Sequence, residues 1–197
     1  RVFESQGHEF VHVVNAPQDG TDAIPSALEL GATATVIATP PLTHYRLTKA
    51  ALESGLDVLV EKPLAHDFGA ALDLANLAYD RARVLSVDST FVHSDAFKFL
   101  TTQGPLLSYQ SLRLAPGPSM AGGIDAGWDL MVHDISILHR LGALDTVMGL
   151  YATGSSRQDV AMASLRLRSG GLAWMMASCK WPTKVRDVVL QFENSTL

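Results

Sequence analysis

Three short apolar runs, separated by stretches with helical spacing, constrain the fold of this 197-residue chain more than any other feature. The runs cover residues 34–38, 57–60 and 84–87, and their composition is typical of strands buried in a parallel sheet. Residues 43–54 and 67–83, which lie between the runs, have the spacing of amphipathic helices. Strands that alternate with helices form right-handed parallel crossovers, so the pattern predicts a doubly wound α/β sheet.

Two further elements are expected ahead of these runs. Residues 9–15 (EFVHVVN) are rich in β-branched residues and predict another strand, which a segment containing Pro17 and Gly20 then ends. Residues 24–30 predict a short helix that ends at Gly31.

The second half of the chain has a different pattern. Residues 91–100 and 128–141 are expected to be helical, with a loop rich in Pro and Gly before the second helix. The tripeptide Ser169-Gly170-Gly171 indicates a hairpin. Strands are expected at residues 106–114, 147–153, 160–167, 172–180 and 185–192. We therefore predict two domains with a cleft between them. Residues 1–90 carry the parallel sheet, and residues 91–197 form an α+β domain with an open, mainly antiparallel sheet.

Composition and charge exclude several classes of protein. With 47% hydrophobic and 18% charged residues, the chain is expected to be globular rather than disordered. A net charge of −5 argues against nucleic acid or an anionic membrane surface as the partner. No apolar run approaches the ~18 residues of a membrane span, and the first residues do not form a signal peptide, so we expect a cytoplasmic protein. The single cysteine, Cys179, cannot form an internal disulfide. A chain that starts at Arg1 rather than Met is expected to be a truncated piece of a longer one.

His8 and His12 match the HExxH pattern of zinc proteases, but the local sequence opposes a metal site. The motif requires a helix, in which residues four apart share one face. Here the surrounding valines favour a strand, which would separate the two imidazoles by ~13 Å. We therefore predict no metal. A zinc hydrolase that uses His8 and His12, or His133 and His139, stays open as an alternative that metal analysis would test.

Two turns follow predicted strands and lie where open α/β sheets bind ligands, at the carboxyl ends of the strands. The first is residues 38–44 (ATPPLTH), which can also be understood as an ordinary loop with Thr43 capping the next helix. The second is Glu61-Lys62-Pro63. The ammonium group of Lys62 can be partly desolvated at this edge, as a general acid or a carbonyl-polarising group requires. A solvated ion pair at the end of the strand would explain the same residues.

A third candidate site lies in the predicted helix 128–141. Asp129 and His133 are four residues apart, so their Cβ atoms lie ~5–6 Å from each other on one helix face. A carboxylate beside an imidazole orients it and makes it a better proton acceptor. An apolar stripe of Met131, Ile135 and Leu138 is expected on the opposite side. The alternative is a surface pair that contributes a few tenths of a kcal/mol.

Taken in order along the chain, these motifs resemble the glucose–fructose oxidoreductase/inositol dehydrogenase (Gfo/Idh/MocA) family. The resemblance rests on TVIATPPLTHYRLTKAALESGLDVLVEKPLA and on WDLMVHDISIL, which is similar to the family's D-x-G-x-H helix. It implies an N-terminal Rossmann-type dinucleotide-binding domain, here partial, and a C-terminal α/β domain for substrate and oligomerisation. It also implies NAD or NADP as cofactor and oxidation of a hydroxyl, or reduction of a carbonyl, on sugars, inositols or nucleotide sugars.

The resemblance assigns roles to residues of this chain. Lys62 corresponds to the catalytic lysine, His133 to the acid/base and Asp129 to its carboxylate partner. Cofactor contacts are implied for Asn15, Thr39, Pro40, His44, Glu61 and Lys62. By analogy, His93 and Arg113 are candidate substrate contacts, and the substrate is expected to be a small carbohydrate-like molecule. The family also implies a homo-oligomer formed through the open C-terminal sheet.

The chain departs from the family pattern at three places. It contains no G-x-G-x-x-G, so the first strand and the pyrophosphate loop are expected to be missing. Asn15 stands where an acidic residue often holds the adenine ribose, which leaves the preference for NAD or NADP open. Met131 replaces a glycine and is expected to add bulk on the nicotinamide side. A non-catalytic ligand sensor or partner-binding protein on the same fold therefore stays open as an alternative.

Overall fold

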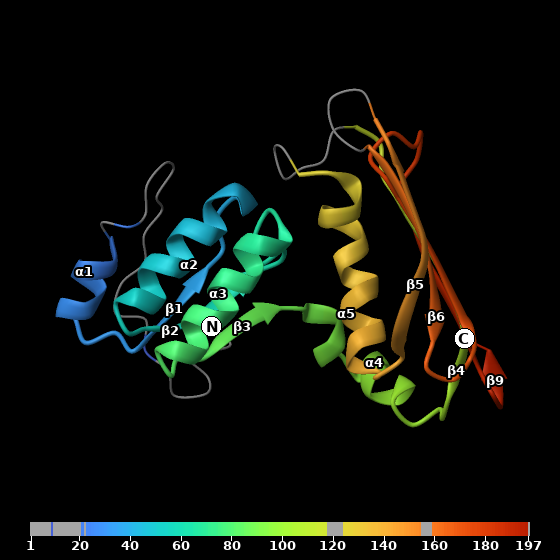
Figure 1. The fold of residues 1–197 in the computed structure, drawn as a ribbon, viewed down its shortest axis with the longest axis horizontal. Helices are drawn as coiled ribbons and strands as arrows, with labels where there is room; N and C mark the ends of the chain where they lie inside the picture. Colours follow the sequence, from blue (N-terminus) through green and yellow to red (C-terminus); the bar gives the residue numbers. More distant parts are fainter. Residues whose placement is uncertain (1–8, 10–20, 22, 118–123, 155–158, 197) are drawn as a thin grey trace. The chain divides into compact units, whose positions relative to one another are not determined.

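The computed structural model describes residues 9, 21, 23–117, 124–154 and 159–196, and it divides into two compact units, Arg1–Asp88 and Ser89–Leu197 (Figure 1). Each unit has a hydrophobic core of its own. The strand expected at residues 9–15 and the histidines at 8 and 12 lie outside the described residues, as does Asn15. No helix among the described residues is long and apolar enough to cross a membrane.

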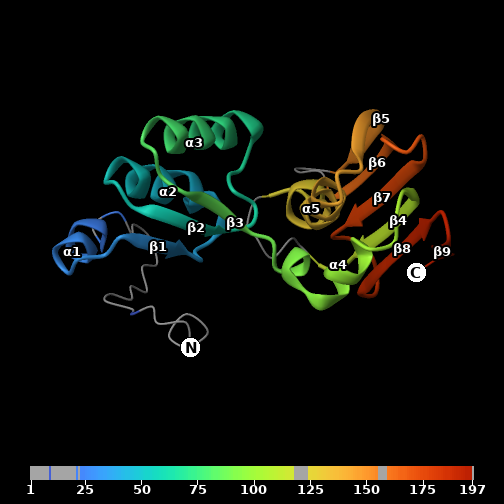
Figure 2. The ribbon, with the colours of Figure 1, turned by 90° about the horizontal axis from the view of Figure 1, so that it is seen from below.

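Unit 1 contains the predicted parallel sheet. Its strands pair in the order β1-β2-β3, and each connection between them passes through a helix. Helices α2 and α3 cover the same face of the sheet, as right-handed crossovers require (Figure 2). The elements are α1 (Ala23–Glu29), β1 (Ala34–Ile37), the 3-10 turn η2 (Pro41–Thr43), α2 (His44–Glu53), β2 (Asp57–Glu61), α3 (Phe68–Asp80) and β3 (Leu85–Asp88).

The strand β1 is less buried than its apolar sequence predicts. Only Ile37 is buried, and 47% of Val36 is exposed. The reason is its position, because β1 forms the edge of the sheet within the described residues and pairs only with β2. The central strand β2 has the expected burial, with Val58 and Val60 at 2% and 0% exposed.

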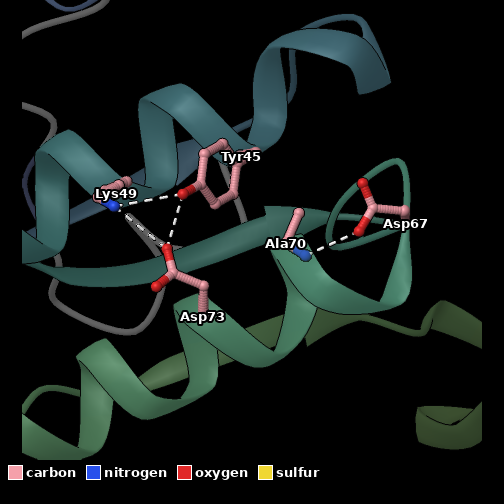
Figure 3. Close-up of polar contacts among 5 residues, drawn as sticks. All are labelled: Tyr45, Lys49, Asp67, Ala70 and Asp73. Atoms are coloured by element: carbon pink, nitrogen blue, oxygen red, sulfur yellow. Dashed lines mark hydrogen bonds and ion pairs between the residues drawn. The ribbon is translucent and has the colours of Figure 1, made fainter.

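A polar cluster joins α2 to α3 on their outer surface (Figure 3). Tyr45 donates a hydrogen bond to Asp73 (2.7 Å), and Lys49 lies 3.2 Å from the same carboxylate oxygen. The hydrogen bond from Tyr45, followed by that from Lys49, lowers the pKa of Asp73 below its usual value.

At the start of α3, the Asp67 carboxylate accepts a hydrogen bond from the amide of Ala70 (2.8 Å) and caps the helix.

Unit 2 is built on a mixed sheet in the order β5-β6-β7-β4-β8-β9. Its pairs are antiparallel except for β4 and β7, so the prediction of a mainly antiparallel sheet is confirmed. Helices α4 and α5 lie on one face of the sheet (Figures 1 and 2). The elements are η3 (Thr90–His93), α4 (Asp95–Leu100), β4 (Leu106–Leu114), the π-helical turn η4 (Gly127–Met131), α5 (Val132–Arg140), β5 (Leu144–Thr153), β6 (Val160–Leu167), β7 (Leu172–Ser178), β8 (Val185–Phe192) and β9 (Ser195–Thr196).

The predicted hairpin joins β6 to β7, and its two glycines serve different purposes. Gly170 has a φ of +85°, the left-handed region that glycine adopts without strain. Gly171 lies against the backbone of β4, where an added Cβ would be 1.9 Å from the carbonyl oxygen of Leu107. The hairpin therefore needs glycine at residue 171 because of a neighbouring strand.

The helix expected over residues 128–141 begins with the π-helical turn η4, and its buried face differs from the predicted stripe at one position. Met131 is 6% exposed and packs in the core of unit 2, and Leu138 is also buried, as the stripe predicts. Ile135, expected in the same stripe, is 37% exposed. Its neighbour Asp134 is buried instead, because Tyr109 and Arg113 hold the carboxylate.

Candidate functional site

The turn after β1 is held by two hydroxyl groups. Thr43 donates to the carbonyl oxygen of Pro40 (2.7 Å), and the hydroxyls of Thr39 and Thr43 lie 2.6 Å apart. Because Thr43 has one hydroxyl hydrogen and uses it on Pro40, Thr39 is the donor of the second bond. The Thr39 side chain is half-buried, and as the donor of this bond its oxygen keeps its acceptor lone pairs. Thr43 orders the turn and does not cap α2 with its side chain, in contrast to the ordinary capping role considered above.

The turn after β2 carries the predicted lysine. Glu61 is the last residue of β2 and is exposed, and Lys62, which follows it, is half-buried. Pro63 is buried and follows a cis peptide bond. Since β1 and β2 are parallel neighbours, with Ile37 in register with Val60, their following turns lie at the same edge of the sheet. This is the carboxyl edge at which open α/β sheets bind ligands.

His44 connects these two turns from inside the protein. Its side chain is 0% exposed, with Nδ1 2.7 Å from the carbonyl oxygen of Pro63 and Nε2 2.8 Å from that of Thr39. Each ring nitrogen therefore faces the backbone of one turn. The expectation that His44 lines the cofactor cleft has to be corrected, because a fully buried ring with both nitrogens engaged has no surface for a ligand. It contributes by holding the two turns that carry Thr39 and Lys62.

The predicted acid/base pair belongs to unit 2. Asp129 lies in the π-turn η4 and is 8% exposed, and its backbone amide donates to the carbonyl oxygen of Asp125 (3.0 Å). The Asp125 carboxylate accepts a hydrogen bond from the amide of Trp128 (2.9 Å), which satisfies a donor at the start of this helix. His133 is half-buried in the first turn of α5. Thus Lys62 is in one unit, and Asp129 and His133 are in the other.

The two candidate substrate contacts have different surroundings. His93 is exposed at the end of η3. Arg113 lies on β4 with 14% of its side chain exposed, and its Nε donates to Asp134 at 2.7 Å. Asp134 also accepts a hydrogen bond from Tyr109 (2.6 Å). No local sequence signal marks Tyr109 or Asp134 as part of a site, although Asp134 directly follows His133 in the chain.

The Tyr109 hydroxyl is a neutral donor over the accessible pH range. Burial, followed by the neighbouring Asp134 charge, raises the pKa of Tyr109 well above its usual range.

Among the described residues there is no group of three or more His, Cys, Asp and Glu side chains that could hold a metal ion. The residues His8 and His12 lie outside that part of the chain.

The chain is similar to several known proteins. Residues 4–89 match the model of an oxidoreductase family with an NAD-binding Rossmann fold, Gfo/Idh/MocA. UDP-N-acetylglucosamine 3-dehydrogenase from Acidithiobacillus ferrooxidans is 30% identical over 148 residues, which are 72% of this chain and 47% of that protein. A crystal structure of that enzyme is similar with a TM-score of 0.72 and 26% identity, over 91% of this chain and 65% of the other.

A more distant solved structure shows the same fold. It is scyllo-inositol dehydrogenase from Lactobacillus casei with bound NAD(H) and scyllo-inositol, similar with a TM-score of 0.73 and 16% identity, over 91% of this chain and 60% of that one. The chain thus spans about half the length of the curated relative and about two thirds of these solved chains.

Proposed function

Because residues 4–89 match the model of the Gfo/Idh/MocA family of NAD-binding oxidoreductases, we propose that the protein belongs to this family and transfers a hydride between a nicotinamide dinucleotide and a secondary alcohol or ketone. The substrate is a sugar, an inositol or a nucleotide sugar. The observation that carries the proposal is the carboxyl edge of the unit 1 sheet, where His44 holds the Thr39 turn and the Lys62 turn together. Lys62 thereby has a defined place beside a ligand-binding edge.

The residues at this edge fit part of a dinucleotide cofactor, NAD or NADP. Thr39 offers acceptor lone pairs, Pro40 and Glu61 are exposed, and the Lys62 ammonium supplies positive charge. These four side chains are the proposed cofactor contacts among the described residues, and Asn15 is a further one outside them. His44 supports the cofactor site through the backbone of the two turns.

The nicotinamide cofactor, when bound, accepts or supplies the hydride. The chain's own residues handle the oxygen and the proton. We assign Lys62 to hydrogen-bond the substrate oxygen and stabilise the negative charge that develops on it. His133 accepts the hydroxyl proton in the oxidative direction, and Asp129 orients its imidazole. The proposed substrate contacts are His93 and the terminal nitrogens of Arg113, whose Nε is bound to Asp134.

The two units divide this function between them. Residues 1–90 bind the dinucleotide, and residues 91–197 bind the substrate and form a homo-oligomer. The exposed apolar side chains on the strands of unit 2 are the surface that we propose for this contact: Val147, Met148, Leu150, Tyr151, Leu172, Trp174 and Val189. We place the protein in the cytoplasm, where the buried thiol of Cys179 stays reduced.

Calorimetry with NAD(H) and NADP(H), followed by a substrate survey that includes scyllo-inositol and UDP-N-acetylglucosamine, tests the proposal on the full-length protein. A protein that binds neither dinucleotide would overturn the enzyme function. Lys62→Ala should lower kcat by ~10²–10⁴, the usual contribution of a positioned polar group. The control Lys98→Ala removes an exposed lysine in unit 2 and should leave kcat unchanged.

The pH profile separates the roles of the two polar residues. If His133 is the base, the acidic limb of the oxidation rate disappears in His133→Ala and survives in Lys62→Ala. Asp129→Asn should lower kcat less than His133→Ala, because the imidazole is still present but less well oriented. If Lys62→Ala loses the acidic limb instead, Lys62 is the proton acceptor.

A further inference from the structure

A buried polar contact fastens α5, the helix that carries His133, to the sheet. Asp134 is 1% exposed, and each of its carboxylate oxygens has its own partner on β4. Oδ1 accepts from the Tyr109 hydroxyl at 2.6 Å, and Oδ2 accepts from Arg113 Nε at 2.7 Å. Tyr109 is itself 0% exposed, so the contact is shielded from solvent and from salt.

The spacing of residues on β4 lets this contact restrain α5 along the strand, and we call Tyr109, Arg113 and Asp134 the clamp. Tyr109 and Arg113 are four residues apart on β4, so their side chains leave the same face at points ~13 Å apart. Both side chains are long, and they converge on one carboxylate from opposite directions along the strand. Ser111, between them on that face, is small and 1% exposed. Movement of α5 in either direction along β4 would therefore lengthen one of the two bonds.

We propose that Asp134 is a positioning residue for His133, which it serves by clamping α5 to β4 through Tyr109 and Arg113. The inference rests on the proposed function, in which His133 handles the substrate proton. His133 and Asp134 are consecutive residues of one helix, so a shift of the Asp134 side chain moves the imidazole with it. The regular part of α5 starts at Val132, directly after the π-turn, so Asp134 fastens its first turn.

Tyr109→Phe is the sharpest test, because it removes one hydroxyl and leaves Arg113 and all proposed cofactor contacts in place. We expect kcat to fall about tenfold with the substrate KM unchanged. This loss is smaller than the roughly 100-fold that a 1 Å misplacement of a catalytic group can cost, because the bond from Arg113 remains. Asp134→Asn, which disturbs both bonds, should lower kcat about 100-fold. The amides of residues 132–140 should exchange faster in Tyr109→Phe than in the wild type.

Leu165→Val is the matched control. It truncates a core side chain of β6 that is 5% exposed and does not take part in the clamp. At an equal drop in the Tm of unit 2, the control should retain the wild-type kcat and the slow exchange of α5. A Tyr109→Phe enzyme with kcat within about twofold of wild type, or a control that loses as much, would overturn the inference.

Failure of the proposed function gives a different result. A wild-type protein without dinucleotide-dependent activity on any of the substrates would overturn the enzyme function and, with it, the role given to His133. The exchange measurement still separates the two ideas, since it reports on the clamp alone. Unchanged exchange of residues 132–140 in Tyr109→Phe would show that Tyr109 does not hold α5, whatever the enzyme does.

Discussion

Replacing His44 by leucine should destabilise unit 1 and leave unit 2 unaffected. Leucine has a similar volume and keeps the packing of this fully buried position, but it donates no hydrogen bond. In either tautomer one ring nitrogen of His44 carries a proton, so at least one backbone carbonyl of Thr39 or Pro63 loses its donor.

A buried acceptor left without a partner costs about 1–3 kcal/mol. For a domain of 60–100 residues, each kcal/mol lowers the Tm by roughly 4–8 °C, so we expect a drop of about 5–20 °C. Because the two turns at the carboxyl edge lose their connection, the affinity for the dinucleotide should fall as well.

The distribution of aromatic residues allows the two units to be followed separately. All three tryptophans, Trp128, Trp174 and Trp181, lie in unit 2, so tryptophan fluorescence reports on that unit. Amide exchange of residues 44–61 reports on unit 1. We expect the exchange of this segment to accelerate in His44→Leu while the fluorescence transition stays where it is in the wild type.

His66→Leu is the control for this experiment. It makes the same replacement in unit 1 at a side chain that is 47% exposed, where the ion pair with Asp67 is a surface one, so its effect should stay within about 1 kcal/mol. The reasoning fails if His44→Leu is as stable as His66→Leu, or if both transitions of His44→Leu shift together. The first result would mean that the ring does not hold the turns, and the second that the units do not unfold separately.

Two other changes have defined outcomes. Gly171→Ala should lower the fluorescence Tm of unit 2, because its Cβ would lie 1.9 Å from the Leu107 carbonyl oxygen and such overpacking costs about 1–3 kcal/mol. Tyr45→Phe should make the stability of unit 1 depend less on pH in the acid range. The pKa of Asp73 in the folded protein lies below its ordinary 3.8, mainly because of the hydrogen bond from Tyr45. The stabilisation from Asp73 is therefore present above pH 3.8 and is lost as the pH falls through the folded pKa. Amide exchange of residues 44–61, measured at several pH values, checks this, and an equal pH dependence of wild type and variant below about pH 4 would contradict it.

Local patterns predicted most of the secondary structure. The strands Leu106–Leu114, Val160–Leu167 and Val185–Phe192 agree with the sequence-based prediction at both ends, since burial on one face of a sheet imposes alternation. The parallel connections of unit 1 were predictable because the helices between its strands are long enough for crossovers. The π-turn at Gly127–Met131 was not predictable, because no residue type in it distinguishes a π-turn from an α-helical turn.

The sequence predicts which turns form the candidate site, but it does not predict where each side chain of the site points. Lys62 could be placed because it directly follows a strand, whose end is fixed by topology. His44 was misplaced, since a histidine at the start of a helix has the same local signal whether it faces a ligand or the interior. The contact of Tyr109 with Asp134 joins residues 25 apart in the chain, and no local pattern contains such a separation.

The place of β4 in its sheet has a consequence for synthesis of the chain. β4 ends at Leu114, and its two neighbours, β7 and β8, begin only at Leu172 and Val185. On the ribosome this strand therefore emerges with both edges unpaired, and unpaired strand edges recruit other chains. Pairing between distant segments is also slow. In unit 1 the neighbouring strands follow one another in the chain, so they can pair while β4 is still without its partner strands. We therefore expect chaperones and the growth temperature to change the yield of native protein mainly through unit 2.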